Sequence, residues 1–157
     1  MTARHGMTMY VQEQTRQAWE AIAAGYDDHV TPSHLWLGAV AISRVGLRAG
    51  ERFLDVAAGS GALAIPAART GAAVTATDIS ATMLARLAER ARGEGLEIET
   101  QVMDGESLDY EDGTFDVAGS QFGVMLFPDM ARGLQELVRV TRRGGRIVFV
   151  VLGPPDR

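Results

Sequence analysis

From residue 51 onward, short apolar segments alternate with segments whose apolar residues repeat at helical spacing. This alternation restricts the fold more than any other feature of the chain. Strands are predicted at 51–57, 73–77, 97–102, 114–120 and 146–152, and helices at about 62–70, 80–92 and 129–141. Alternating strands and helices produce a parallel sheet with right-handed crossovers and helices on both faces. The predicted fold class is therefore α/β.

Two further helices are predicted before this alternation begins. The first spans about 10–26, where Trp19, Ile22 and Tyr26 form one apolar stripe. The second begins at Thr31-Pro32, because threonine can cap a helix and proline suits its first position, and it ends near Gly46. We expect one domain over 1–157, with a helical cap at 1–48 and a ligand-binding core at 49–157.

Composition excludes several kinds of protein. The net charge of −5 argues weakly against nucleic acid or an anionic membrane as the main partner. The absence of cysteine excludes a disulfide framework and a thiolate nucleophile. His5, His29 and His34 lack metal-ligand spacing, so no metal site is expected. The polar N-terminus is unlike a signal peptide, and no apolar run reaches the length of a membrane helix, which predicts a cytoplasmic protein.

The Gly59-Ser60-Gly61 bend joins the first strand to its crossover helix. Glycines here permit positive φ and let a ligand approach the backbone, and the helix N-terminus offers free N–H groups. In open α/β sheets, ligands bind outside the carboxyl ends of the strands. The bend therefore indicates a ligand site, although a tight structural turn explains it equally well. Residues 59–64 also match the dinucleotide pattern G-x-G-x-x-[GA].

Two carboxylates lie where the next two strands end. Asp78 follows Gly59 by nineteen residues, where an acidic side chain can accept both hydroxyls of a ribose, or can cap a turn. Asp104 follows the third strand. Its carboxylate can accept from the amine of adenine while the N–H of Gly105 reaches a ring nitrogen, or the Asp-Gly pair can be a surface turn.

Asp55 lies inside the first strand. A carboxylate at this position would repel a pyrophosphate, because both groups are anions. A ligand with a cationic end, such as the ammonium and sulfonium of S-adenosylmethionine, would favour it. A buried carboxylate could also accept N–H bonds from the bend. We expect Asp55 to do both, with a purely structural aspartate as the alternative.

With these residues in view, the chain resembles class I S-adenosylmethionine-dependent methyltransferases. It is most similar to the branch that includes the ubiquinone/menaquinone-biosynthesis C-methyltransferases. The resemblance covers nearly all of 10–152 and is carried, in order, by LDVAAGSG, TDISATML, VMDGESLDYEDGTFDV and RVTRRGGRIVFV. The chain departs from the family pattern at Ala57, where glycine is commoner, and at Arg143, where proline is usual.

The resemblance implies a Rossmann-like sheet of strand order 3-2-1-4-5 and methyl transfer from S-adenosylmethionine to a small-molecule acceptor. It also implies roles for particular residues. The methionine moiety is expected at Ala57, Gly59, Ser60 and Gly61, the ribose at Asp78, the adenine at Ile79, Asp104 and Gly105, and the methyl donor at Gln121. Tyr26 is expected to cover the cofactor or to pack in the core. No catalytic residue is predicted, because single histidines such as His29 and His34 are more often structural.

Two other functions stay open. An NAD(P)-dependent oxidoreductase is favoured only by the 59–64 pattern and Asp78, and a catalytic Tyr-Lys pair is lacking. The second is a methyltransferase-like protein that binds the cofactor or a partner but carries out no reaction. The family fold usually continues past the fifth strand with a helix and two strands, so the apolar run IVFVVL at 147–152 predicts either a truncated chain or a homodimer that covers this edge.

Overall fold

The computed structural model describes residues 2–153, with side chains from residue 13 onward except Ala24. The elements are α1 (Thr2–His29), α2 (Thr31–Val45), β1 (Arg52–Val56), α3 (Ala64–Arg69), β2 (Ala73–Asp78), α4 (Ala81–Gly93), β3 (Ile98–Val102), β4 (Phe115–Gln121), the 3-10 helix η1 (Val124–Leu126), α5 (Met130–Val140) and β5 (Thr141–Val150). The predicted alternation of strands and helices is confirmed.

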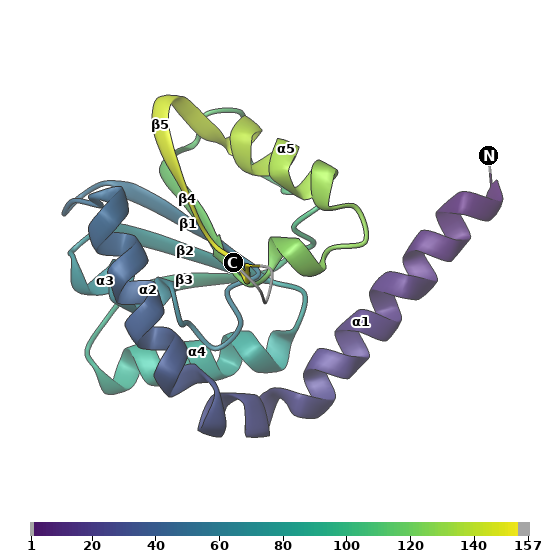
Figure 1. Ribbon diagram of the computed structural model, residues 1–157, viewed down its shortest axis with the longest axis horizontal. Helices are drawn as coiled ribbons and strands as arrows, with labels where there is room; N and C mark the ends of the chain where they lie inside the picture. The colour runs from purple at the N-terminus through teal and green to yellow at the C-terminus, as the bar shows by residue number, and fades with distance from the viewer. Residues whose placement is uncertain (1, 154–157) are drawn as a thin grey trace.

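The five strands form one parallel sheet in the order β3-β2-β1-β4-β5, as predicted. Helices α2, α3 and α4 cover one face and α5 covers the other, while α1 extends away from the sheet (Figure 1). The chain moves outward through β2 and β3 and then returns past β1 to β4. The strand order therefore reverses between β1 and β4, and the carboxyl ends of these strands define a crevice.

The core has two parts, one on each face of the sheet. Phe53 of β1 packs with Leu87 of α4 on one face, and Leu54 packs with Leu137 of α5 on the other. All four side chains are buried. A strand covered on both faces needs apolar side chains facing both ways, which explains the continuous apolar character of β1. Asp55 interrupts this pattern.

Helix boundaries follow local signals. Pro66 lies in the first turn of α3, where the missing N–H would have had no helical partner. The Ser80 hydroxyl caps α4 by accepting from the N–H of Met83 at 3.1 Å. Gly46, with φ of 65°, ends α2 in the left-handed conformation that glycine adopts without strain.

Three predicted features of these elements were wrong. Helix α1 begins at Thr2 rather than near residue 10, and Ile22 is 50% exposed instead of sharing a buried stripe. Strand β5 begins at Thr141, directly after α5, because an irregularity opposite Phe115 and Val117 lets the arginine- and glycine-rich segment 141–145 extend along β4.

Strand β5 is an edge of the described sheet. The side chains of Phe149, Val151 and Leu152 at its end are 41%, 58% and 71% exposed. The part of the predicted tail from residue 154 onward lies outside the described residues. A homodimer through this edge stays a prediction.

Candidate functional site

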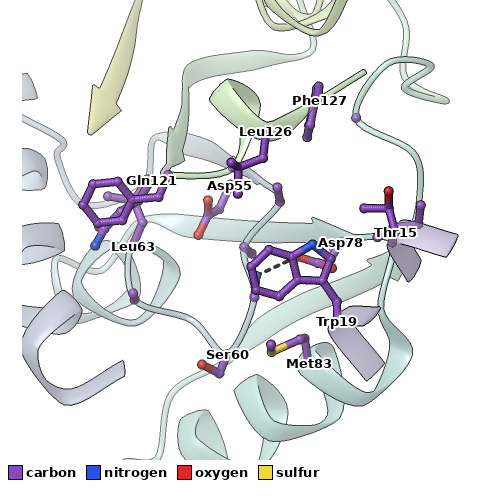
Figure 2. Close-up of a pocket in the computed structure, with 18 of the residues that line it drawn as sticks. Thr15, Trp19, Asp55, Ser60, Leu63, Asp78, Met83, Gln121, Leu126 and Phe127 are labelled. Atoms are coloured by element: carbon purple, nitrogen blue, oxygen red, sulfur yellow. Dashed lines mark hydrogen bonds between the residues drawn. The ribbon is translucent and has the colours of Figure 1, made fainter. Parts of the chain in front are cut away.

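A cavity of about 320 Å³ lies at the carboxyl ends of the central strands (Figure 2). Its floor is made by the segments that follow β1, β2, β3 and β4, and its roof by α1 and α2. The volume is at the lower end of the range for small-molecule sites. The cavity thus lies where the strand order predicts a ligand.

Nine of the ten residues predicted for the site line this cavity. They are Asp55, Ala57, Gly59, Ser60, Asp78, Ile79, Asp104, Gly105 and Gln121. The tenth, Gly61, lies below the bend with φ of +100°, and a Cβ there would stand 2.9 Å from Leu87 and 3.0 Å from Ile65. Gly61 therefore allows the crossover helices to pack under the bend, and its predicted contact with a ligand stays a prediction.

The Asp78 carboxylate holds the glycine bend. Its Oδ2 accepts from the N–H of Gly59 at 2.8 Å (Figure 2), and its Oδ1 accepts from the N–H of Ser80 at 2.9 Å. Asp78 is 8% exposed. Burial raises the pKa of Asp78, and these amide bonds partly oppose that rise. The carboxylate that fixes the bend is therefore that of Asp78, whereas this role was predicted for Asp55 from the sequence.

Asp55 is fully buried and unpartnered. Its exposed fraction is 0%, and neither carboxylate oxygen accepts a hydrogen bond within the described residues. Burial, and to a smaller extent the negative charge of Asp78, raises the pKa of Asp55 well above its usual range. The nearby backbone amide of Ala64 lowers this pKa, but it does not have the geometry of a hydrogen bond to the carboxylate. The prediction that Asp55 holds the bend was wrong. What remains is an unsatisfied carboxyl group in the cavity wall, which suits a cationic ligand group.

Backbone strain gathers beside this carboxyl group. Ala57 and Phe122 are the non-glycine residues with positive φ in the described chain, at 58° and 59°. A Cβ at Gly123 would stand 2.4 Å from the Cβ of Ala57, so the segments after β1 and β4 are in close contact. Strained non-glycine conformations cost about 1–3 kcal/mol each and cluster at ligand sites.

A row of four rings lines one wall of the cavity. Ring centroids lie 5.7 Å apart between Trp19 and Tyr26, 6.0 Å between Tyr26 and His34, and 4.8 Å between His34 and Phe122. The Tyr26 hydroxyl lies 3.3 Å from His34 Nδ1, and Gln121 Nε2 donates to the His34 carbonyl at 2.9 Å. Tyr26 thus lines the cavity, one of the two positions expected for it, and burial raises its pKa.

The helical cap is bonded to the floor of the cavity. The hydroxyls of Thr31 and Ser60, both buried, lie 2.6 Å apart. Asp27 pairs with Arg90 of α4 at 2.5 Å. At Gly38, a Cβ would stand 2.0 Å from the carbonyl oxygen of Ala62, so α2 rests directly on the segment after the bend.

Several lining residues were not predicted from the sequence, namely Thr15, Trp19, Leu63, Met83, Met103, Glu106, Phe122, Leu126 and Phe127. Trp19 carried a signal, since it belongs to the predicted apolar stripe of the first helix, but periodicity cannot tell a core face from a cavity face. No sequence signal marked Phe127 as a cavity residue. Its ring packs directly against Gly105, where a Cβ would stand 2.4 Å from that ring.

Within residues 13–153, no group of three or more histidine, aspartate or glutamate side chains is arranged to hold a metal. The His5 side chain lies outside the described residues. None of the helices described is both long and apolar enough to cross a membrane.

An open parallel sheet with a cavity at its switch point places this chain among the α/β proteins that bind ligands at the carboxyl ends of their strands. Residues 54–149 match the family model described as a methyltransferase domain. The chain belongs to this family, that of class I S-adenosylmethionine-dependent methyltransferases.

The chain is also similar to curated proteins, one of which is named as a methyltransferase. The chain is 41% identical over 151 residues to an uncharacterized protein of Mycobacterium tuberculosis, covering 90% of this chain and 54% of that one. It is 35% identical over 148 residues to the ubiquinone/menaquinone biosynthesis C-methyltransferase UbiE of Bdellovibrio bacteriovorus, covering 90% and 63%.

A solved structure of phosphoethanolamine N-methyltransferase 2 from Haemonchus contortus, in complex with phosphomonomethylethanolamine and S-adenosylhomocysteine, aligns with a TM-score of 0.66 at 26% identity, over 72% of this chain and 27% of that one. The chain spans about half the length of the curated relatives it matches.

Proposed function

We propose that this protein transfers a methyl group from S-adenosylmethionine to a small-molecule acceptor. The observation that carries the proposal is the unpartnered, fully buried carboxyl group of Asp55 in the cavity wall. An ammonium group placed against it would supply the missing partner. The proposal takes the ligand as S-adenosylmethionine because this ligand combines such an ammonium with a nucleoside.

The nucleoside would bind at the β2 and β3 side of the cavity. The Asp78 oxygens each use one lone pair on a backbone amide, and their remaining lone pairs are able to accept the ribose hydroxyls. Ile79 offers an apolar contact for adenine, and Asp104 with Gly105 offers an acceptor and a donor for its edge. The acidic lining of this side supports a ligand without a phosphate.

The amino-acid part would bind at the β1 and β4 side. Asp55 would accept from the ammonium, and the bend at Gly59 and Ser60 would lie beside it. Gln121 donates its amide N–H to His34, while its Oε1 is buried without a partner in the described chain and is available to a ligand. Gln121 therefore would mark the end of the cavity nearest the transferred group.

Bound S-adenosylmethionine supplies the electrophilic methyl group, and the leaving thioether is neutral, so the chain needs no strong acid. The residues of the cavity act mainly by orientation, which in well-ordered systems lowers a barrier by about 7–11 kcal/mol. The roof formed by α1 and α2 would exclude water from the reacting groups.

An NAD(P)-dependent oxidoreductase fits the cavity less well, because a pyrophosphate would meet the buried Asp55 carboxyl group. A protein that binds S-adenosylmethionine without methyl transfer is the second candidate, and only turnover separates it from the first. A cytoplasmic location and a homodimer through β5 also belong to this proposal. The first rests on the absence of cysteine from the sequence, and the second on the exposed side chains at the end of β5.

The test is calorimetric titration with S-adenosylhomocysteine, with NADH as the control ligand. We expect S-adenosylhomocysteine alone to bind, and to raise the free energy of unfolding by about 2.7 kcal/mol at 100 times Kd. Binding of NADH alone would overturn the proposal. Light scattering after size exclusion tests the dimer, and a monodisperse monomer would contradict it.

A further inference from the structure

One histidine of the cap lines the cavity, and its surroundings fix how its ring lies. His34 of α2 stands between the rings of Tyr26 and Phe122, and Gln121 holds its carbonyl oxygen. Contacts from α1 and from the segment after β4 therefore restrain the ring, and the bond from Gln121 of β4 holds the backbone of the same residue. The ring thus has two aromatic neighbours and one polar contact, with the Tyr26 hydroxyl.

The surroundings favour the neutral ring. Burial lowers the pKa of His34, and the ring's hydrogen-bond partner within the described chain is the uncharged Tyr26 hydroxyl. The acidic groups that line the same cavity are Asp55, Asp78, Asp104 and Glu106, and burial raises the pKa of the first two. No arginine lines the cavity in the described chain, and the sequence contains no lysine.

The second ring nitrogen is free. Nδ1 faces the Tyr26 hydroxyl at 3.3 Å, whereas Nε2 makes no hydrogen bond with a described residue, and His34 lines the cavity. If Nδ1 carries the ring proton and donates it to the Tyr26 oxygen, Nε2 has an unshared electron pair. A neutral imidazole in this state accepts a proton.

The position of His34 matches the reacting end of the ligand. The groups suited to the nucleoside lie on one side of β1, with Asp78 at the end of β2 and Asp104 after β3. Gln121 ends β4 and Phe122 follows it, on the other side of β1. The sulfonium joins the nucleoside to the amino-acid chain, so with the nucleoside on the first side and the ammonium at Asp55 it lies over the carboxyl end of β1. His34, whose ring contacts Phe122, faces the same cavity from the β4 side.

We propose that His34 is the general base of the methyl transfer, with Nε2 taking the proton of the acceptor and Tyr26 positioning the ring. This inference rests on the proposed function. The acceptor's lone pair forms the bond to the methyl carbon, the carbon–sulfur bond breaks with its pair left on sulfur, and the proton passes from the acceptor to Nε2. The acceptor class is thus a small molecule whose nucleophilic oxygen or nitrogen carries a proton that it must lose.

The first experiment measures the ring state by ¹⁵N NMR of the imidazole nitrogens in the protein saturated with S-adenosylhomocysteine. We expect the His34 ring to be neutral at pH 7, with the proton on Nδ1 and a bare Nε2, and Tyr26→Phe to shift this balance toward Nε2–H. His34→Gln identifies its signals, and His29→Gln is the control. A wild-type His34 ring with its proton on Nε2 would overturn the proposal. An imidazolium formed on binding would also overturn it, because His34 would then pair with the carboxylate of the ligand.

The second experiment uses turnover on phenols of graded acidity with S-adenosylmethionine. General bases contribute about 10²- to 10⁴-fold. His34→Gln should lower kcat by this factor for phenols that are protonated at the assay pH and change it little for phenols already ionised, whereas His29→Gln should match wild type. Equal losses on both kinds of phenol would contradict a base. Failure to bind S-adenosylhomocysteine at all contradicts the proposed function instead, and the ring state in the free protein still reports on Nε2.

Discussion

Replacing Asp55 by asparagine should raise the stability of the free protein and weaken its ligand binding. The carboxyl group is fully buried, has no hydrogen-bond partner in the described chain and lies near the charge of Asp78. An unsatisfied buried polar group costs about 1–3 kcal/mol, and more when charged. Asparagine keeps the shape and removes the charge, so we expect a gain in the free energy of unfolding of about 1 kcal/mol, or about 2–4 °C in Tm.

The same substitution removes the partner proposed for the ammonium. Hydrogen bonds to charged groups contribute about 1.5–3 kcal/mol, so the Kd for S-adenosylhomocysteine should rise about 10- to 100-fold. Methylthioadenosine, which has no ammonium, should bind both proteins equally. Asp28→Asn, on the exposed end of α1, is the matched control.

Both effects should depend on pH with a definite sign. The folded-state pKa of Asp55 lies above its usual value of 3.8, so the folded protein holds this proton more tightly than the unfolded chain. Its contribution to stability therefore falls as pH rises from about 3.8 through the folded pKa, while affinity for the ammonium rises over the same window. The difference between wild type and Asp55→Asn should show this window in chemical denaturation and in calorimetry. A variant less stable than wild type, with unchanged affinity, would refute the reasoning.

Three further outcomes are expected. Asp78→Ala removes the acceptor of two amide bonds, so it should lower Tm as well as weaken S-adenosylhomocysteine binding at least tenfold; an unchanged Tm would contradict its role in the bend. Gly38→Ala should cost about 1–3 kcal/mol in urea denaturation, because its Cβ would meet a carbonyl oxygen, whereas Gly25→Ala has open space and should be neutral or stabilising. In Trp36→Phe protein the remaining tryptophan is Trp19, whose emission should change on S-adenosylhomocysteine binding; no change would place Trp19 away from the ligand.

The floor of the cavity was predictable because its signals are local. The Gly59 bend and the carboxylate of Asp78 each occupy the end of a strand, and parallel strands bring these ends to one edge. Sequence spacing could not assign their hydrogen bonds. Which of Asp55 and Asp78 accepts from Gly59 depends on the path of the bend between β1 and β2, and the structure gives that bond to Asp78.

The roof was less predictable for a different physical reason. A helix face that lines a cavity has the same apolar repeat as one that packs on a core, so Trp19 and Tyr26 could not be separated from core residues by periodicity. The pairing of Thr31 with Ser60 joins residues 29 positions apart and has no local signal. The start of β5 at Thr141 was missed because its arginines and glycines are unlike a buried strand.

The division of the cavity into floor and roof has a consequence for how such proteins diversify. The floor lies within residues 54–149, the segment that matches the methyltransferase family model, whereas Trp19, Tyr26 and His34 precede it. The roof meets the floor through a few discrete contacts, among them the hydroxyl pair of Thr31 and Ser60. Under the proposed function, an exchange of the N-terminal helices that preserved these contacts would change the groups offered to the acceptor while keeping Asp55, Asp78 and Asp104 of the floor in place, so the two parts of the cavity would be able to change separately.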